Sequence, residues 1–211
     1  MEHLRRVVLL AGPSGSGKSY IARQTGLPVL CLDDFYKDGD DPTLPWRNGR
    51  VDWDSPDSWN AAAAVETIAR LVRDGKAEVP VYAIGADRQV DTRTLDLTGS
   101  PLFVAEGIFA AEIVAECRRR GLLAGAYALR RPRGATFLRR LARDLAEQRK
   151  APRVLLRRGV ALLRAEPAVL RRQTGLGAEA ARASEVLRRV AHLLTGHPAP
   201  PATDDLPGRG R

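Results

Sequence analysis

The sequence predicts an α/β protein in which helices flank a parallel β-sheet. Short apolar runs of strand length alternate with longer helical patterns, an order typical of parallel sheets with right-handed crossovers. The first apolar run leads directly into a glycine-rich loop and a helix start. A chain of 211 residues is long enough for one domain with a sizeable core. We expect one domain over residues 1–194, followed by a disordered tail over 195–211 with several Pro and Gly residues.

The strands are predicted from apolar runs that are too short for helices. The first three runs stop at Gly12, at the pair Asp33-Asp34 and at Glu106, as buried parallel strands do. A further short run that contains Tyr82 predicts part of a small β-hairpin near the substrate site. The buried strands are expected at residues 7–11, 29–32, 102–105 and 126–129, and the hairpin strand at 79–82.

The helices are predicted from longer segments with capping or stop signals. Ser55-Pro56-Asp57 offers Ser as an N-cap and Pro at the first helical position, and Gly75 offers a stop. Residues 37–54 are rich in Asp, Gly and Pro without periodicity, so we expect a long functional loop there. The helices are expected at residues 18–24, 55–73, 108–120, 134–150, 154–165 and 179–194, with 134–150 as a lid and the later ones as a helical C-terminal extension.

Residues 12–19, GPSGSGKS, fit the phosphate-loop pattern GxxxxGK[ST]. Glycines allow the backbone to turn successive N–H groups onto phosphate oxygens, and the following helix presents its positive end to the same anion. Lys18 would reach the β- and γ-phosphates, and Ser19 would place its hydroxyl on Mg²⁺. The loop predicts a P-loop NTPase-type sheet with ATP and Mg²⁺ as cofactors. The nucleotide-binding residues are expected to be Gly12, Ser14, Gly15, Ser16, Gly17, Lys18 and Ser19.

Acidic residues follow two of the predicted strands. Asp33 and Asp34 close one strand and Glu106 closes another, and ligands of open parallel sheets bind off the carboxyl ends of strands. A carboxylate there can orient an acceptor hydroxyl or anchor a magnesium ion. The alternative for the Asp pair is a role in capping a turn.

The net charge of +9 is concentrated in one part of the chain. Residues 117–194 hold 20 Lys and Arg but only 5 Asp and Glu. Such a basic segment can indicate an anionic partner, but arginines on solvated helix faces explain it more simply, so we expect no nucleic-acid partner. No apolar run has the length of a membrane span, and the two cysteines show no metal-ligand spacing. We therefore expect a cytoplasmic protein without a membrane partner.

The motifs GPSGSGKS, DDFY, DWDSPDSW, PVY, EGIFA and RRLARD, in this order, resemble the uridine kinase family. The resemblance runs from Val7 to about Lys150. It implies a five-stranded parallel sheet with a β-hairpin over the substrate. It also implies transfer of the γ-phosphate of ATP to the 5′-hydroxyl of uridine or cytidine, and a homo-oligomer.

The resemblance also implies roles for individual residues. Asp33 would activate the 5′-hydroxyl and help to hold Mg²⁺, together with Ser19 and Glu106. Arg140 and Arg143 would reach phosphates from the lid, where positive charge can stabilise a phosphoryl group in transfer. The residues expected to contact the nucleoside are Tyr36, Trp53, Asp54, Tyr82, Asp87 and Arg88, with Asp54 on the ribose hydroxyls.

The hairpin departs from the family pattern. Ala83 follows Tyr82 where an Asp is typical, and Asp87 stands where a base-reading His is expected. Either Asp87 reads the base, or Arg88 turns inward and supplies the missing donors. Two alternatives to a uridine or cytidine kinase therefore stay open. One is a related P-loop kinase for another nucleoside, pantothenate or a sugar phosphate, and the other is a nucleotide-binding regulatory protein.

Overall fold

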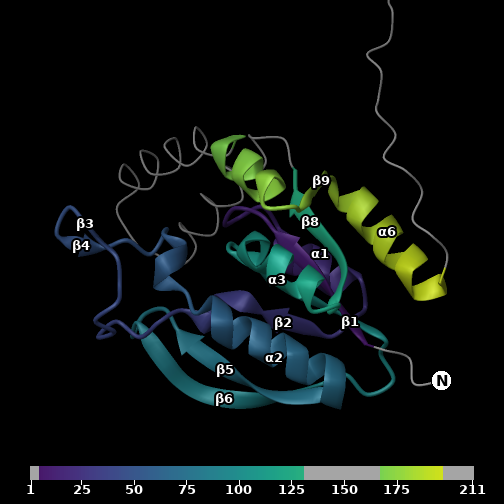
Figure 1. Ribbon diagram of the computed structural model, residues 1–211, viewed down its shortest axis with the longest axis horizontal. Helices are drawn as coiled ribbons and strands as arrows, with labels where there is room; N and C mark the ends of the chain where they lie inside the picture. Colours follow the sequence, from purple (N-terminus) through teal and green to yellow (C-terminus); the bar gives the residue numbers. More distant parts are fainter. Residues whose placement is uncertain (1–4, 131–166, 197–211) are drawn as a thin grey trace, which may run out of the picture.

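The computed structural model describes residues 5–130 and 167–196, and its centre is a five-stranded sheet (Figure 1). The strand order is β2-β7-β1-β8-β9, and each neighbouring pair is parallel. The carboxyl ends of the strands therefore meet along one edge. This confirms the predicted parallel sheet. The strands are β1 (Arg6–Ala11), β2 (Val29–Cys31), β7 (Leu102–Gly107), β8 (Leu123–Leu129) and β9 (Glu179–Ala181).

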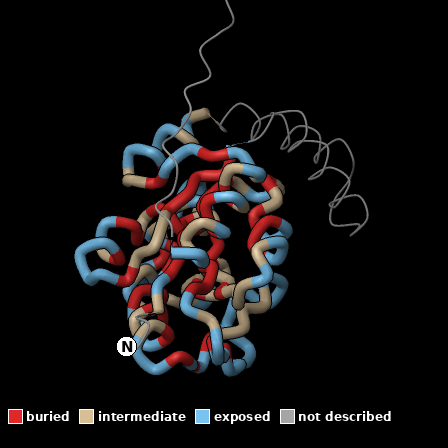
Figure 2. The backbone as a smooth tube through the Cα atoms, turned by 90° about the vertical axis from the view of Figure 1, so that its right-hand side faces the viewer, coloured by how far each residue is buried: buried red, intermediate tan, exposed pale blue. Residues whose placement is uncertain are grey.

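Helices cover both faces of the sheet because side chains alternate along the central strand. Val7 and Leu9 of β1 lie in one core cluster with α2 and α3, whereas Val8 and Leu10 lie in a second cluster with α1 and α6. The buried residues accordingly run through the middle of the molecule, with exposed residues outside (Figure 2). The helices are α1 (Lys18–Gln24), α2 (Ala61–Asp74), α3 (Val114–Arg119) and α6 (Ala183–Thr195).

Two hairpins stand apart from this sheet. β5 (Lys76–Ala83) pairs with β6 (Arg88–Asp96), so the predicted short strand at 79–82 is the end of a longer hairpin. β3 (Trp46–Arg47) and β4 (Arg50–Val51) form a much smaller one inside the segment predicted as loop. In Figure 1 the long hairpin lies beside α2 at one edge of the molecule.

The helix predicted from Ser55 begins later than expected. Ser55 does act as a cap, since its Oγ accepts from the N–H of Asp57, but the capped element is only the 3₁₀ turn η2 (Pro56–Ser58). The helix α2 starts at Ala61 with Asn60 as its own N-cap. Its end at Gly75, which has the left-handed φ of 75°, was predicted correctly.

Trp59 explains the interruption. It adopts an extended conformation, forms a bridge with Tyr36 and buries its ring in the core. Its indole N–H donates to the carbonyl oxygen of Leu32 at 2.6 Å. A helix that continued through Trp59 would lose these contacts. No local pattern in the sequence indicates them.

The prediction of one helix over 179–194 was wrong at its start. Residues Glu179–Ala181 form β9, and α6 begins at Ala183. Glu and Ala favour helices locally, but pairing with Tyr127–Leu129 of β8 completes the sheet edge and outweighs that preference. A short helix at 167–175 precedes it and was not predicted. The helices predicted at 134–150 and 154–165, and nearly all of the predicted tail, lie outside the described residues.

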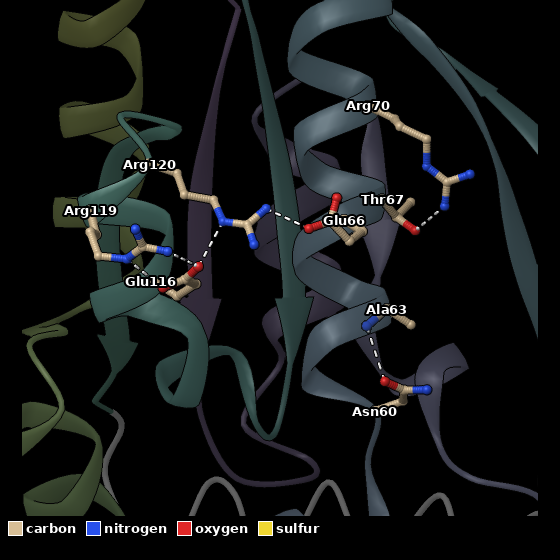
Figure 3. A network of polar contacts seen from close by, with 8 residues as sticks. All are labelled: Asn60, Ala63, Glu66, Thr67, Arg70, Glu116, Arg119 and Arg120. Carbon is tan, nitrogen blue, oxygen red and sulfur yellow. Dashed lines mark hydrogen bonds and ion pairs between the residues drawn. The ribbon is translucent and has the colours of Figure 1, made fainter.

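The 108–120 segment is helical in two pieces, the 3₁₀ turn η3 (Ala110–Ile113) and α3. Arg120 joins α3 to α2, because it donates to Glu116 at 2.7 Å and to Glu66 at 2.5 Å (Figure 3). Hydrogen bonds from Arg119 and Arg120 lower the pKa of Glu116 to about 2. These groups lie at the surface, so their net stabilisation is small. Among the described residues, no helix is long and apolar enough to cross a membrane.

Candidate active site

The phosphate loop lies between β1 and α1, as the sequence predicts. Gly15 and Gly17 adopt left-handed φ angles of 77° and 85°, which favour glycine. Gly12 is also needed, because a Cβ there would lie 2.9 Å from the Oγ of Ser16. Lys18 is almost fully buried, with its Nζ 3.5 Å from the carbonyl oxygen of Pro13. The loop therefore has the turns and the buried ammonium group that a phosphate site requires.

Two predicted metal ligands meet beside this loop. Ser19, from α1, donates its hydroxyl to Oε1 of Glu106, from β7, at 2.6 Å. Glu106 is only 5% exposed. Burial raises the pKa of Glu106, and the charge of Lys18 together with the Ser19 hydrogen bond oppose that rise.

Asp33 approaches the same edge from the neighbouring strand. It lies in the 3₁₀ turn η1 (Leu32–Phe35) that follows β2, and its Oδ1 accepts from the N–H of Ile108 at 3.1 Å. Gly107 makes this approach possible. A Cβ at Gly107 would lie 2.7 Å from the Cβ of Leu32 and 2.9 Å from that same Asp33 oxygen.

These residues fit a magnesium ion. Ser19, Asp33 and Glu106 offer only oxygen atoms, and Asp33 and Glu106 are close enough that the charge of Asp33 acts on the pKa of Glu106. Within the described residues there is no cluster of three or more His, Cys, Asp or Glu side chains able to hold a metal. Magnesium does not need one, because it is commonly held by one or two carboxylates together with substrate phosphates.

Asp34 differs from its neighbour in what it contacts. Its Oδ1 accepts from the backbone N–H of Tyr82 at 3.4 Å, which ties η1 to the end of β5. Burial is the main cause that raises the pKa of Asp34. Of the two acids, Asp33 faces the loop after β7 and Asp34 faces the hairpin.

An aromatic cluster lies next to the two acids. The ring of Tyr36 is 5.8 Å from that of Trp53 and 5.9 Å from those of Tyr82 and Phe109, measured between centroids. The Tyr36 hydroxyl donates to the carbonyl oxygen of Trp53 at 3.3 Å. The pKa of Tyr36 is raised, first by burial and then by the negative charges of Asp33 and Asp54. The structure thus brings together Tyr36, Trp53, Tyr82, Asp33 and Asp54.

Sequence reasoning missed two members of this cluster. Phe109 packs between Tyr36 and Trp59, edge-on to the first ring and tilted to the second, with ring centroids 5.9 Å apart in each pair. Phe109 lies within the EGIFA motif, so its place after Glu106 was the signal that could have identified it. Trp59 is the last aromatic residue of the DWDSPDSW motif, and it supports Phe109 from the core side.

The turn end of the hairpin is fastened to the loop at residues 37–39 by backbone and side-chain hydrogen bonds. The N–H of Gly39 donates to the carbonyl oxygen of Asp87 at 2.6 Å, and the Tyr82 hydroxyl donates to that of Lys37 at 3.1 Å. Asp87 lies in the turn with a φ of 48°, and Arg88 begins β6. Both are exposed.

The charge of Asp87 reaches the aromatic cluster. It contributes, after burial, to raising the pKa of Tyr82 to about 12. Asp54 is also exposed. Arg140 and Arg143 lie outside the described residues.

The sheet, the phosphate loop and the two acids are those of a P-loop kinase, and the relatives of the chain support a phosphotransferase with an alcohol group as acceptor. The particular relatives are uridine kinases. The chain is 26% identical over 157 residues to the uridine kinase of Lactobacillus johnsonii, covering 70% of this chain and 72% of that protein. It is 29% identical over 154 residues to the uridine kinase of Shewanella amazonensis, covering 67% and 70%.

A solved structure shares the fold. It is described as a candidate fructose transport system kinase from Silicibacter sp. TM1040, with a TM-score of 0.58, 18% identity, and coverage of 83% of this chain and 88% of that chain. No family model matches the sequence.

Proposed function

We propose that this protein transfers the γ-phosphate of ATP to the 5′-hydroxyl of a nucleoside, with uridine or cytidine as the acceptor. The observation that carries the proposal is the position of Asp33. On one side of it lie Ser19 and Glu106, which are joined at 2.6 Å next to the phosphate loop. On the other side lies Tyr36, whose raised pKa reflects the charges of both Asp33 and Asp54.

Each group has a task that follows from its chemistry. Lys18 stabilises negative charge on the phosphates, and Ser19, Asp33 and Glu106 would hold Mg²⁺. When bound, that ion neutralises charge that develops between the β- and γ-phosphates. Asp33 orients the acceptor hydroxyl and accepts its proton, and the hydrogen bond from Ile108 fixes which of its oxygens stays available.

The acceptor side offers stacking and hydrogen bonding. Tyr36, Trp53 and Tyr82 present aromatic surface suited to a flat base. Asp54 is exposed next to this cluster, where its carboxylate can accept hydrogen bonds from ribose hydroxyls.

A second candidate is a related kinase with another small-molecule acceptor. It is favoured by the hairpin turn, where Asp87 is exposed and an acceptor-only carboxylate replaces a possible imidazole donor. Arg88, at the start of β6, could supply donors instead.

The test is a panel of acceptors with ATP and Mg²⁺. Uridine, cytidine, adenosine, pantothenate and a sugar phosphate would be compared by ADP release and by mass spectrometry of the product. We expect a 5′-phosphorylated pyrimidine nucleoside as the main product, formed at least about 10²-fold more slowly by a Lys18→Ala variant. Turnover confined to pantothenate or the sugar phosphate would support the second candidate. ATP binding without transfer to any acceptor would contradict both.

A further inference from the structure

The short helix at residues 167–175 touches the loop that carries the candidate site. Arg172 forms an ion pair with Glu112 of η3 at 3.0 Å, and Gln173 donates from Nε2 to the carbonyl oxygen of Ile108 at 3.2 Å. The two contacts differ in exposure. The Arg172 side chain is about half exposed, whereas Gln173 is only 3% exposed. Gln173 is therefore the buried contact between this helix and the loop after β7.

Packing alone does not explain a glutamine at this position. Its Oε1 is buried and has no hydrogen-bond partner among the described residues. The orientation of the amide is fixed, because the Ile108 carbonyl can only accept, so Nε2 must face it. An apolar side chain of similar length would fill the same space and remove the unpaired Oε1, but it would leave the Ile108 carbonyl oxygen without this donor. The feature that the glutamine adds is the donor to Ile108.

Ile108 is held at both of its backbone polar groups. Its N–H donates to Oδ1 of Asp33 at 3.1 Å, and its carbonyl oxygen accepts from Gln173. The backbone just before it is closely packed, since Gly107 has no room for a Cβ beside Leu32 and Asp33. The next residue is Phe109, whose ring packs on Tyr36. Movement of this segment would therefore shift the candidate acceptor acid and the aromatic cluster together.

We propose that Gln173 is a positioning residue that fixes residues 107–109, and through them the Asp33 carboxylate and the ring of Phe109. This inference rests on the proposed function, in which Asp33 orients the acceptor hydroxyl. Among the described residues, the side-chain hydrogen bond of Gln173 joins it to Ile108 and not to the phosphate loop or to the Ser19–Glu106 pair. Loss of the Gln173 donor therefore disturbs the alignment of the acceptor hydroxyl with Asp33, whereas the affinity for ATP stays the same.

The experiment compares three variants of the full chain with the wild type. Gln173→Met keeps an unbranched side chain of similar length but removes the donor. Gln173→Glu keeps the shape and places an acceptor against the Ile108 carbonyl. Arg172→Gln is the matched control, because it removes the other contact of the same helix. For each protein, kcat, the KM for ATP, the KM for the acceptor and Tm would be measured, together with amide hydrogen exchange at Ile108.

For Gln173→Met we expect kcat to fall by about 10-fold, since small misplacements of reacting groups cost up to about 10²-fold. The KM for ATP should stay within about two-fold of the wild-type value. Tm should change little, because removing the unpaired Oε1 offsets the loss of the donor to the Ile108 carbonyl. Exchange at Ile108 should become faster. Gln173→Glu should lose more activity than Gln173→Met, and Arg172→Gln should keep its kcat within about two-fold.

A purely structural role predicts a different pattern. Wild-type kcat and unchanged exchange in Gln173→Met would overturn the inference, and so would an equal loss of kcat in Arg172→Gln. If Gln173→Met lowers Tm strongly, the kcat of Gln173→Glu and the hydrogen exchange at Ile108 test the inference instead. A kcat that falls only in proportion to the folded fraction would also overturn the inference. Failure of the proposed function is recognised separately, because the wild type would then phosphorylate no acceptor. In that case the inference, which depends on the proposed function, would also be wrong.

Discussion

The two sides of the candidate site are built in different ways. The phosphate side grows out of the central sheet, and two of its charged groups are buried, with Lys18 6% and Glu106 5% exposed. The acceptor side depends on a separate two-stranded hairpin, where Asp87 and Arg88 are exposed and Ile84 is 67% exposed. The base of the hairpin packs into the core through Val79 and Leu95, whereas its turn end is fastened by hydrogen bonds, among them one between Gly39 and Asp87.

This difference suggests that phosphoryl transfer and selection of the acceptor depend on separate parts of the structure. Lys18 and Glu106 are packed in the interior, so they cannot move without disturbing the core. The hairpin pairs only with itself, so its turn can change with little effect on the sheet. Selection of the acceptor can therefore vary while phosphoryl transfer is kept.

The largest effect is expected on the phosphate side. Lys18→Ala removes the buried ammonium that stabilises the transferring phosphoryl group. We expect kcat to fall at least about 10²-fold, on the order of 3 kcal/mol. Lys76→Ala, at an exposed position on the hairpin, is the control and should keep its activity. Full activity in a folded Lys18→Ala protein would contradict the assignment of the ATP site.

Two glycines, one from each side, test the comparison directly. A Cβ at Gly107 would meet Leu32 and Asp33 at under 3 Å, whereas one at Gly85 in the hairpin turn would meet nothing within 4 Å. We expect Gly107→Ala to lower the free energy of unfolding by about 1–3 kcal/mol, as overpacking does, and to lower kcat about 10-fold. Gly85→Ala should change neither. Equal effects in denaturant titrations and activity assays would show that the two sides do not differ in this way.

The sugar of the acceptor should matter next. If Asp54 accepts hydrogen bonds from the ribose, uridine should be a better substrate than 2′-deoxyuridine. A site built to pair a hydroxyl discriminates against the analogue that lacks it, but Asp54 is exposed, so we expect a ratio of only about 10-fold in kcat/KM. In Asp54→Ala the ratio should shrink towards one. Equal rates for both nucleosides with the wild type would remove Asp54 from the ribose site.

The smallest effect is expected at the hairpin turn. Asp87→His restores the possible imidazole donor at an exposed position with a positive φ. We expect kcat/KM for uridine to rise by a few-fold, roughly 2 to 5 on the scale of one weak contact, with less change for adenosine. Comparison of uridine, cytidine and adenosine measures this. No change for any base would mean that Asp87 faces solvent and does not read the base.

Much of the phosphate side could be predicted from the sequence because its signals are local. The glycine-rich loop Gly12–Ser19 lies between a predicted strand and a predicted helix. The acids Asp33 and Glu106 stand at the ends of two further predicted strands. The contact between Ser19 and Glu106 spans 87 positions, yet it follows from the rule that parallel strands share one edge.

The remaining features depend on contacts that the local sequence does not encode. Trp59 interrupts the predicted helix because its ring enters the core, and β9 is a strand only because β8 offers it a partner. Gln173 could not be identified as a neighbour of Ile108, since 65 positions separate them and no motif includes both. The hairpin could be predicted, but its attachment to residues 37–39 could not, because its hydrogen bonds, from side chains as well as from the backbone, join residues that lie 45 or more positions apart.

The most direct test of the central claim is Asp33→Asn, with ATP binding and turnover measured on the same protein. Asparagine keeps an oxygen for the Ile108 N–H but removes the charge. We expect the Kd for ATP, measured without Mg²⁺ because Asp33 is a proposed ligand of that ion, to change little, while kcat falls by at least about 10²-fold, the size of a general-base contribution. Unchanged turnover would contradict the central claim and would make Asp33 a turn residue.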